Sequence, residues 1–93
     1  MPKYIVVPGP MGPEMGIPFS EIESHANMAK HFGGKEKVLG AGEFSIYCDS
    51  DNQFNLCCFG ESSTLEKKSR GRIDAIALKW SLFCSSDNVK LQK

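Results

Sequence analysis

The sequence lacks a long hydrophobic run, a net charge and any cysteine pair at metal-ligand spacing. No apolar stretch approaches the roughly 18 residues of a membrane-spanning helix, so no membrane partner is expected. The 11 basic and 11 acidic side chains cancel, which argues against broad binding to duplex nucleic acid. No secretory signal and no Cys-x-x-Cys motif is present, so we expect a cytoplasmic protein with reduced thiols. Its cysteines are Cys48, Cys57, Cys58 and Cys84.

Catalytic and metal-binding motifs are also absent. His25 and His31 would lie on different sides of a helix, so they cannot hold one metal ion together. The acidic cluster at 49–52 lacks the complete pattern of a calcium loop and predicts a turn. Neither the P-loop pattern Gly-x-x-x-x-Gly-Lys-Ser/Thr nor the dinucleotide-binding pattern Gly-x-Gly-x-x-Gly occurs. We therefore predict no catalytic residue, no metal and no cofactor, and a binding protein rather than an enzyme.

The composition is that of a globular protein, and 93 residues suffice for a single domain over 1–93. Residues 8–18 are rich in proline and glycine and predict a loop or wide hairpin connection. Met11, Met15 and Ile17 make this loop apolar, which suits either a lid or an interface. Residues 89–93 are expected to form a frayed tail.

Hydrophobic periodicity predicts an α+β fold. Strands are expected at 4–7, at 16–19, and in an alternating hairpin over 44–48 and 54–59. Helices are expected at 25–32 and from about 70 or 73 to 83. The last helix carries an apolar stripe that is predicted to be buried: Ile73, Ile76, Ala77, Trp80 and Phe83. The predicted architecture is a three- to four-stranded antiparallel sheet with both helices packed on one face.

The segment before the last helix is the strongest local indication of function. It concentrates hydroxyl and basic side chains: Ser62, Ser63, Thr64, Lys67, Lys68, Ser69, Arg70 and Arg72. Hydroxyl donors, positive charge and the free N–H groups of a helix start are what a phosphate or other anion requires. These residues are the candidate anion site; an ordinary solvated surface loop is the alternative.

Three segments carry a resemblance to a known family. They are residues 59–70 (FGESSTLEKKSR) with Asp74 and Ala75, residues 17–25 (IPFSEIESH), and residues 39–44 (LGAGEF). Together they resemble a family of short, uncharacterised bacteriophage and prophage proteins with a Gly-Glu-Ser…Lys-Ser-Arg pattern. The resemblance implies a location in the host cytoplasm and a role in binding a host protein or a small signalling nucleotide.

Three functional hypotheses follow. The first is a non-enzymatic protein that sequesters a phosphorylated or nucleotide-derived signal of host defence, with its site shared in a homo-oligomer. The second is a protein-interaction module, an inhibitor or adaptor of a host protein, which uses the apolar loop or an exposed sheet edge. The third is a small hydrolase that acts on the same phosphorylated ligand.

Overall fold

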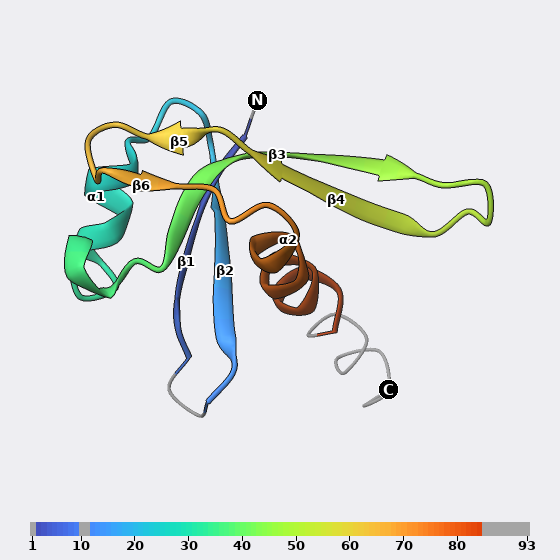
Figure 1. Ribbon diagram of the computed structural model, residues 1–93, viewed down its shortest axis with the longest axis horizontal. Helices are drawn as coiled ribbons and strands as arrows, with labels where there is room; N and C mark the ends of the chain where they lie inside the picture. Colours follow the sequence, from blue (N-terminus) through green and yellow to red (C-terminus); the bar gives the residue numbers. More distant parts are fainter. Residues whose placement is uncertain (1, 10–11, 85–93) are drawn as a thin grey trace.

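The computed structural model describes residues 2–9 and 12–84. Its centre is a four-stranded antiparallel sheet with the strand order β2-β1-β3-β4 (Figure 1). These strands are β1 (Lys3–Pro8), β2 (Glu14–Phe19), β3 (Gly40–Cys48) and β4 (Phe54–Phe59). A separate two-stranded sheet is formed by β5 (Glu61–Ser62) and β6 (Lys67–Lys68). The helices are α1 (His25–Lys30) and α2 (Arg72–Lys79), with a 3₁₀ turn η1 (Lys35–Lys37) and a π-helical turn η2 (Trp80–Cys84). The predicted α+β class is confirmed, and the tail at 89–93 lies outside the described residues.

The proline- and glycine-rich segment is a hairpin, and its second half is a strand. β2 pairs with β1 from Lys3↔Phe19 to Pro8↔Glu14, so the strand expected at 16–19 is present but begins two residues earlier, and the predicted loop over 8–18 is too long at its C-terminal end. Pro18 lies within β2, which is an edge strand where a missing N–H is tolerated. Met11 of the predicted apolar loop lies outside the described residues.

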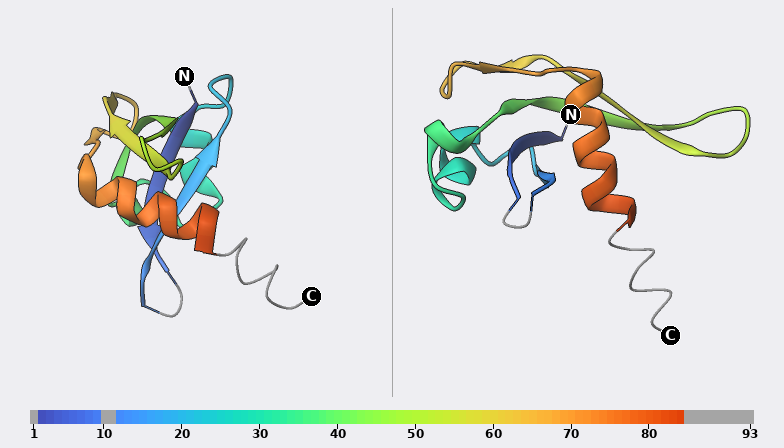
Figure 2. Two further views of the ribbon diagram at one scale, coloured as in Figure 1. Left: turned by 90° about the vertical axis from the view of Figure 1, so that its right-hand side faces the viewer. Right: turned by 60° about the horizontal axis from the view of Figure 1, so that its bottom comes forward.

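The two helices cover opposite faces of the sheet, which corrects the prediction that they share one face (Figure 2). Along β1, Tyr4 and Val6 join the core cluster that contains Ala77 and Leu78 of α2. Ile5 and Val7 join the other cluster, which contains Ala29 of α1. Because successive side chains of a strand point to opposite faces, β1 contributes to two cores at once. This explains why its residues 4–7 are all apolar.

Helix α1 has the predicted start and ends two residues before the predicted end at 32. Ser24 is its N-cap and accepts the Asn27 N–H at 3.0 Å. At the other end, the Gly34 N–H donates to the Ala29 carbonyl at 2.8 Å. Gly33 and Gly34 both have positive φ, which is why glycine is suited to this helix end.

Helix α2 is rotated relative to the prediction. It buries Asp74, Ala77 and Leu78, whereas Ile73, Ile76 and Trp80 are 56%, 64% and 56% exposed. The expected burial of the apolar stripe is therefore wrong for these three residues, and the Phe83 side chain lies outside the described part. Polar contacts hold the buried side of the helix against the sheet. Asp74 accepts a hydrogen bond from the Tyr4 hydroxyl, and Ser81 Oγ accepts the Gly16 N–H at 2.9 Å.

Small residues let α2 lie directly against the sheet. A Cβ on Gly16 would overlap the Leu78 backbone, and a Cβ on Gly40 would overlap the Asp74 carboxylate. The close approach of helix and strands therefore depends on glycine at both positions. This contact selects the Asp74–Leu78 side of the helix and leaves the isoleucines outside.

The predicted antiparallel β3–β4 hairpin is present, with Phe44 opposite Cys58, and it projects beyond the rest of the molecule (Figure 1). Phe44, Leu56 and Cys58 near its base are buried under α2. Towards the tip, Ile46 and Tyr47 are exposed. The predicted turn at 49–52 is present, because Asp49 accepts the backbone N–H groups of Asp51 and Gln53.

Candidate functional site

The segment predicted as an anion site folds into a small hairpin, and its residues are divided among different surroundings. β5 and β6 pair through Glu61↔Lys68 and Ser62↔Lys67. Leu65 in the connecting turn is buried in the core on the α1 side of the sheet, so it anchors the hairpin. Lys67 is half-buried and Lys68 is exposed on β6. The eight candidate residues therefore do not line one common pocket.

The hydroxyl residues of this hairpin border a small hollow of about 230 Å³. Ser62 is buried, and its Oγ lies 3.2 Å from Thr64 Oγ1 and accepts the Leu65 N–H at 3.3 Å. Ser63 and Thr64 line the same hollow with Lys3, Ser24, His25, Glu43 and Glu61. Two carboxylates among the lining residues make this hollow a poor site for an anion.

His25 in this hollow is tied to the sheet. Its Nε2 lies 3.0 Å from the Gly42 carbonyl, so that nitrogen carries the proton and donates. The ring edge also packs on Phe19, with centroids 5.4 Å apart. Burial lowers the pKa of His25, because the charged imidazolium is disfavoured away from water. His25 is therefore a neutral, positioned residue rather than a cationic ligand for an anion.

Ser69 and Arg70 belong to a partly buried network, here called the polar cluster and made of Tyr4, Glu14, Ser69, Arg70 and Asp74. The Tyr4 hydroxyl lies 2.6 Å from Asp74 Oδ2 and 2.7 Å from Ser69 Oγ. Arg70 donates from Nε to Asp74 Oδ1 and from Nη2 to Glu14 Oε1, each at 2.7 Å. The Arg70 N–H also donates to Asp74 Oδ2 at 2.9 Å. The cluster thus joins β1, β2 and the start of α2.

The charged groups of the polar cluster are paired with one another. Asp74 is fully buried, and its charge is balanced by Arg70 and by hydrogen-bond donors. Burial, followed by the hydrogen bond to Asp74, raises the pKa of Tyr4 far above its ordinary value. The ion pair with Glu14 raises the pKa of Arg70. Since its donors are already engaged, Arg70 is not an open anion ligand.

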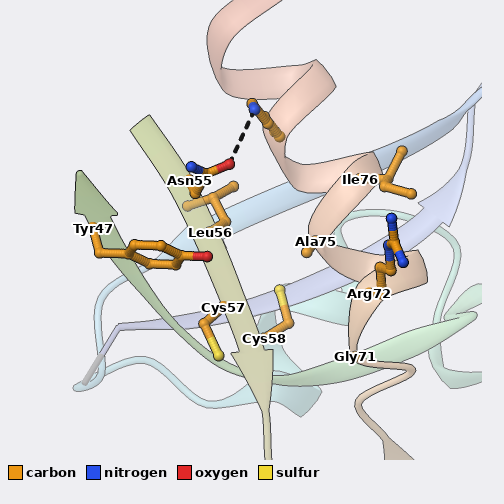
Figure 3. A pocket seen from close by; sticks show the side chains of 10 residues that line it. Tyr47, Asn55, Leu56, Cys57, Cys58, Gly71, Arg72, Ala75 and Ile76 are labelled. Atoms are coloured by element: carbon orange, nitrogen blue, oxygen red, sulfur yellow. Dashed lines mark hydrogen bonds between the residues drawn. The ribbon is translucent and has the colours of Figure 1, made fainter. Parts of the chain in front are cut away.

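The last predicted residue, Arg72, lines a larger groove of about 580 Å³ between β4 and α2 (Figure 3). We call it the β4–α2 groove; it is lined by Tyr47, Asn55, Leu56, Cys57, Cys58, Gly71, Arg72, Ala75, Ile76 and Lys79. Arg72 and Ile76 come from the helix side, and Tyr47 and Asn55 come from the hairpin side. The sequence had placed Arg72 in the site, whereas Tyr47, Asn55 and Lys79 were missed.

The β4–α2 groove is positively charged. Arg72 and Lys79 line it, and none of its described lining residues carries a carboxylate. The Arg72 side chain is exposed and has no hydrogen bond or ion pair with the described residues. Lys79 Nζ donates to Asn55 Oδ1 at 3.4 Å. The groove could therefore accept negative charge without displacing an ion pair of Arg72.

The thiols in this groove differ in exposure. Cys58 points toward α2 and is buried, whereas Cys57 is exposed. Burial raises the pKa of Cys58 to about 11. The Cys58 thiol is therefore protonated at neutral pH, which removes the thiolate that nucleophilic catalysis requires.

The outer side of α2 is apolar. Ile73, Ile76 and Trp80, here called the α2 apolar face, are all exposed. They border a hollow of about 370 Å³ together with Pro13, Glu14 and Ala77. Ile76 lines both this hollow and the β4–α2 groove, so the two surfaces are continuous. Their residues could have been found from the helical spacing, but that spacing is also typical of a core.

Residues 2–9 and 12–84 contain neither a metal-binding group nor a membrane-spanning helix. No group of three or more histidine, cysteine or acidic residues is arranged to hold a metal ion. In the same part of the chain, no helix has the length and apolar character needed to cross a membrane. No protein-family model, curated protein or solved structure matches the chain.

Proposed function

We propose that this chain is a non-enzymatic protein-interaction module that binds its partner through the α2 apolar face and the adjoining β4–α2 groove. The observation that carries the proposal is the exposure of Ile73, Ile76 and Trp80, three large apolar side chains on one side of one helix. A contiguous exposed apolar surface next to a groove is typical of a binding surface, whereas scattered apolar residues are not.

The contacts of the side chains favour this surface of α2 over the candidate anion site at 62–72 as the binding site. The polar cluster engages Ser69 and Arg70, and the hairpin turn engages Ser62. By contrast, the described residues leave the outer side of α2 uncovered. Trp80 and Ile76 are the expected central contacts, because large side chains that become desolvated provide most of the binding free energy.

Selection from a display library of random dodecapeptides tests the proposal. We expect the wild-type protein to enrich specific peptides and Ile76→Asp to lose that enrichment. Ile22→Asp is the matched control, because Ile22 is also an exposed isoleucine but lies in the connection between β2 and α1. Equal enrichment by all three proteins would contradict a site on α2, and no enrichment by the wild type would contradict the module itself.

A second candidate function is supported by Arg72. A free guanidinium in a groove without carboxylates could bind the phosphate of a small molecule or nucleotide, as the sequence hypothesis of a sequestered defence signal requires. Calorimetric titration with mono-, di- and cyclic nucleotides tests it. We expect Arg72→Ala to abolish the binding heat and Lys30→Ala, on α1, to preserve it. Native mass spectrometry of the same samples would show whether the site is shared in a homo-oligomer.

A further inference from the structure

We infer that the β4–α2 groove binds an extended, acidic polypeptide segment that adds to the outer edge of β4 as a further strand. The inference rests on the proposed interaction module and specifies its partner. It combines three properties of the groove: β4 is the outermost strand of the described sheet, the helix wall is apolar at Ile76, and Arg72 and Lys79 line the groove with no carboxylate among its described lining residues.

The hydrogen-bond register gives β4 an outward-facing row of backbone groups. Asp49 donates its N–H to the Gln53 carbonyl at 3.0 Å, so this pair belongs to the hydrogen-bonded set of the hairpin. Because such pairs alternate in an antiparallel ladder, Asn55 and Cys57 also bond toward β3. The N–H and C=O groups of Leu56 and Cys58 then point away from β3, toward the outer edge.

These backbone groups lie beside the groove. β4 is the last strand in the described sheet, and Leu56 and Cys58 both line the groove. Another strand could hydrogen-bond to them at the usual spacing of about 4.8 Å between strands. A helix cannot do so, because its own backbone groups are engaged internally. The edge therefore favours an extended ligand.

The helix wall determines which side chains suit such a ligand. Residues of an added strand that point toward α2 would pack on Ile76, which is 64% exposed in the unbound protein. Arg72 and Lys79 are seven residues apart on α2. That separation is about 10 Å along the helix, which about three extended residues would span. We therefore expect an apolar residue between acidic ones within a short stretch.

Charge complementarity selects an acidic segment. Arg72 has no bonding partner among the described residues, and Lys79 contacts the neutral amide of Asn55. Asp49 in the nearby turn is also a neighbour of Lys79, but its carboxylate accepts from Asp51, Gln53 and Asn55. A basic segment would place like charges opposite Arg72, which is unfavourable at an interface.

The test begins with the same dodecapeptide library. We expect the enriched peptides to be acidic, rich in β-branched residues and free of proline. The double variant Arg72→Glu, Lys79→Glu should bind the best peptide at least about tenfold more weakly. Lys30→Glu, Lys35→Glu is the matched control, because it makes the same charge change away from the groove. Circular dichroism would verify that both variants are folded.

A scan of backbone N-methylation along the best peptide then tests strand addition directly. Since every second N–H of an added strand faces β4, methylation should abolish binding at alternate positions. Sensitivity without this alternation would overturn the inference. So would enrichment of non-acidic peptides, or binding that the double charge reversal leaves unchanged.

The remaining outcomes separate this inference from the proposed function. If peptides bind and depend on Ile76 but not on Arg72 and Lys79, the module stands and the acidic-strand inference fails. If no peptide is enriched, both fail. A dimer in native mass spectrometry, with slow hydrogen exchange at Leu56 and Cys58, would show that a second copy occupies the edge and would also overturn the inference.

Discussion

Arg70 and Arg72 lie on either side of Gly71, yet their surroundings are opposite. Arg70 is held by two carboxylates and helps to attach α2 to the sheet. Arg72 faces the β4–α2 groove and has no bonding partner among the described residues. Two like residues in one basic segment can thus serve structure and binding separately. The difference depends on which carboxylates the fold brings near each arginine, and the composition of the segment does not show this.

The largest predicted effect concerns the centre of the polar cluster. Asp74→Ala leaves the buried Tyr4 hydroxyl and the Arg70 guanidinium without their shared acceptor. We expect the free energy of unfolding in urea to fall by about 3 kcal/mol, as is typical when one member of a buried ionic network is removed. Asp51→Ala, in the exposed hairpin turn, is the control and should change it by less than about 0.5 kcal/mol.

A direct test of the comparison replaces each arginine in turn. Arg70→Ala should lower the free energy of unfolding by about 2 kcal/mol, because Asp74 loses its charged partner. Arg72→Ala should leave it within about 0.5 kcal/mol, since no contact of the folded protein is lost. Urea denaturation of both variants in the same buffer measures the difference. Equal losses would refute the assignment of separate roles.

Tyr4→Phe tests how much the Tyr4 hydroxyl in the polar cluster contributes to stability. The ring would keep its packing against Phe44, whose centroid is 6.4 Å away, while the hydroxyl bonds to Asp74 and Ser69 are lost. We expect a decrease of about 1 kcal/mol in the free energy of unfolding. Tyr47→Phe, at an exposed position in the β4–α2 groove, is the matched control and should have no measurable effect on stability.

The buried imidazole of His25 leads us to expect a pH dependence of stability. Its pKa is lowered in the folded state, so the unfolded chain binds more protons as the pH falls below the unfolded value of about 6.5. Stability should therefore be complete above that pH and decrease below it, toward the folded pKa. Urea denaturation at pH 7.5 and 5.5 should show a smaller decrease for His25→Gln than for the wild type.

Much of the fold could be predicted because local patterns specify it. Alternation gave the β3–β4 hairpin, and Ser24 with Gly33 and Gly34 gave the bounds of α1 to within two residues. The strand β2 was predicted two residues too short because proline and glycine normally indicate a loop, and an edge position makes Pro18 acceptable. The one-face arrangement was wrong although residues 4–7 already carried the sign of a strand buried on both sides.

The candidate site was predictable only in part. Hydroxyl and basic residues identified a segment, and Arg72 from that segment does line the β4–α2 groove. Whether Ser69 or Arg70 was available depended on partners distant in sequence, Tyr4 and Glu14, whereas Ser62 bonds within its own hairpin turn. The rotation of α2 could not be predicted from the sequence either. The ion pair with Arg70 allows Asp74 to be buried, and the apolar stripe then lies on the outer side of the helix.

The smallest predicted effect tests that rotation. Ile76→Ala should change the free energy of unfolding by less than about 0.5 kcal/mol, because this side chain is already exposed in the folded protein. Leu78→Ala, two residues along the same helix and fully buried, should lower it by about 3 kcal/mol. If α2 instead buried its apolar stripe, the two losses would be reversed. A stable Ile76→Ala protein that no longer enriches peptides would show that this isoleucine contributes to binding rather than to folding.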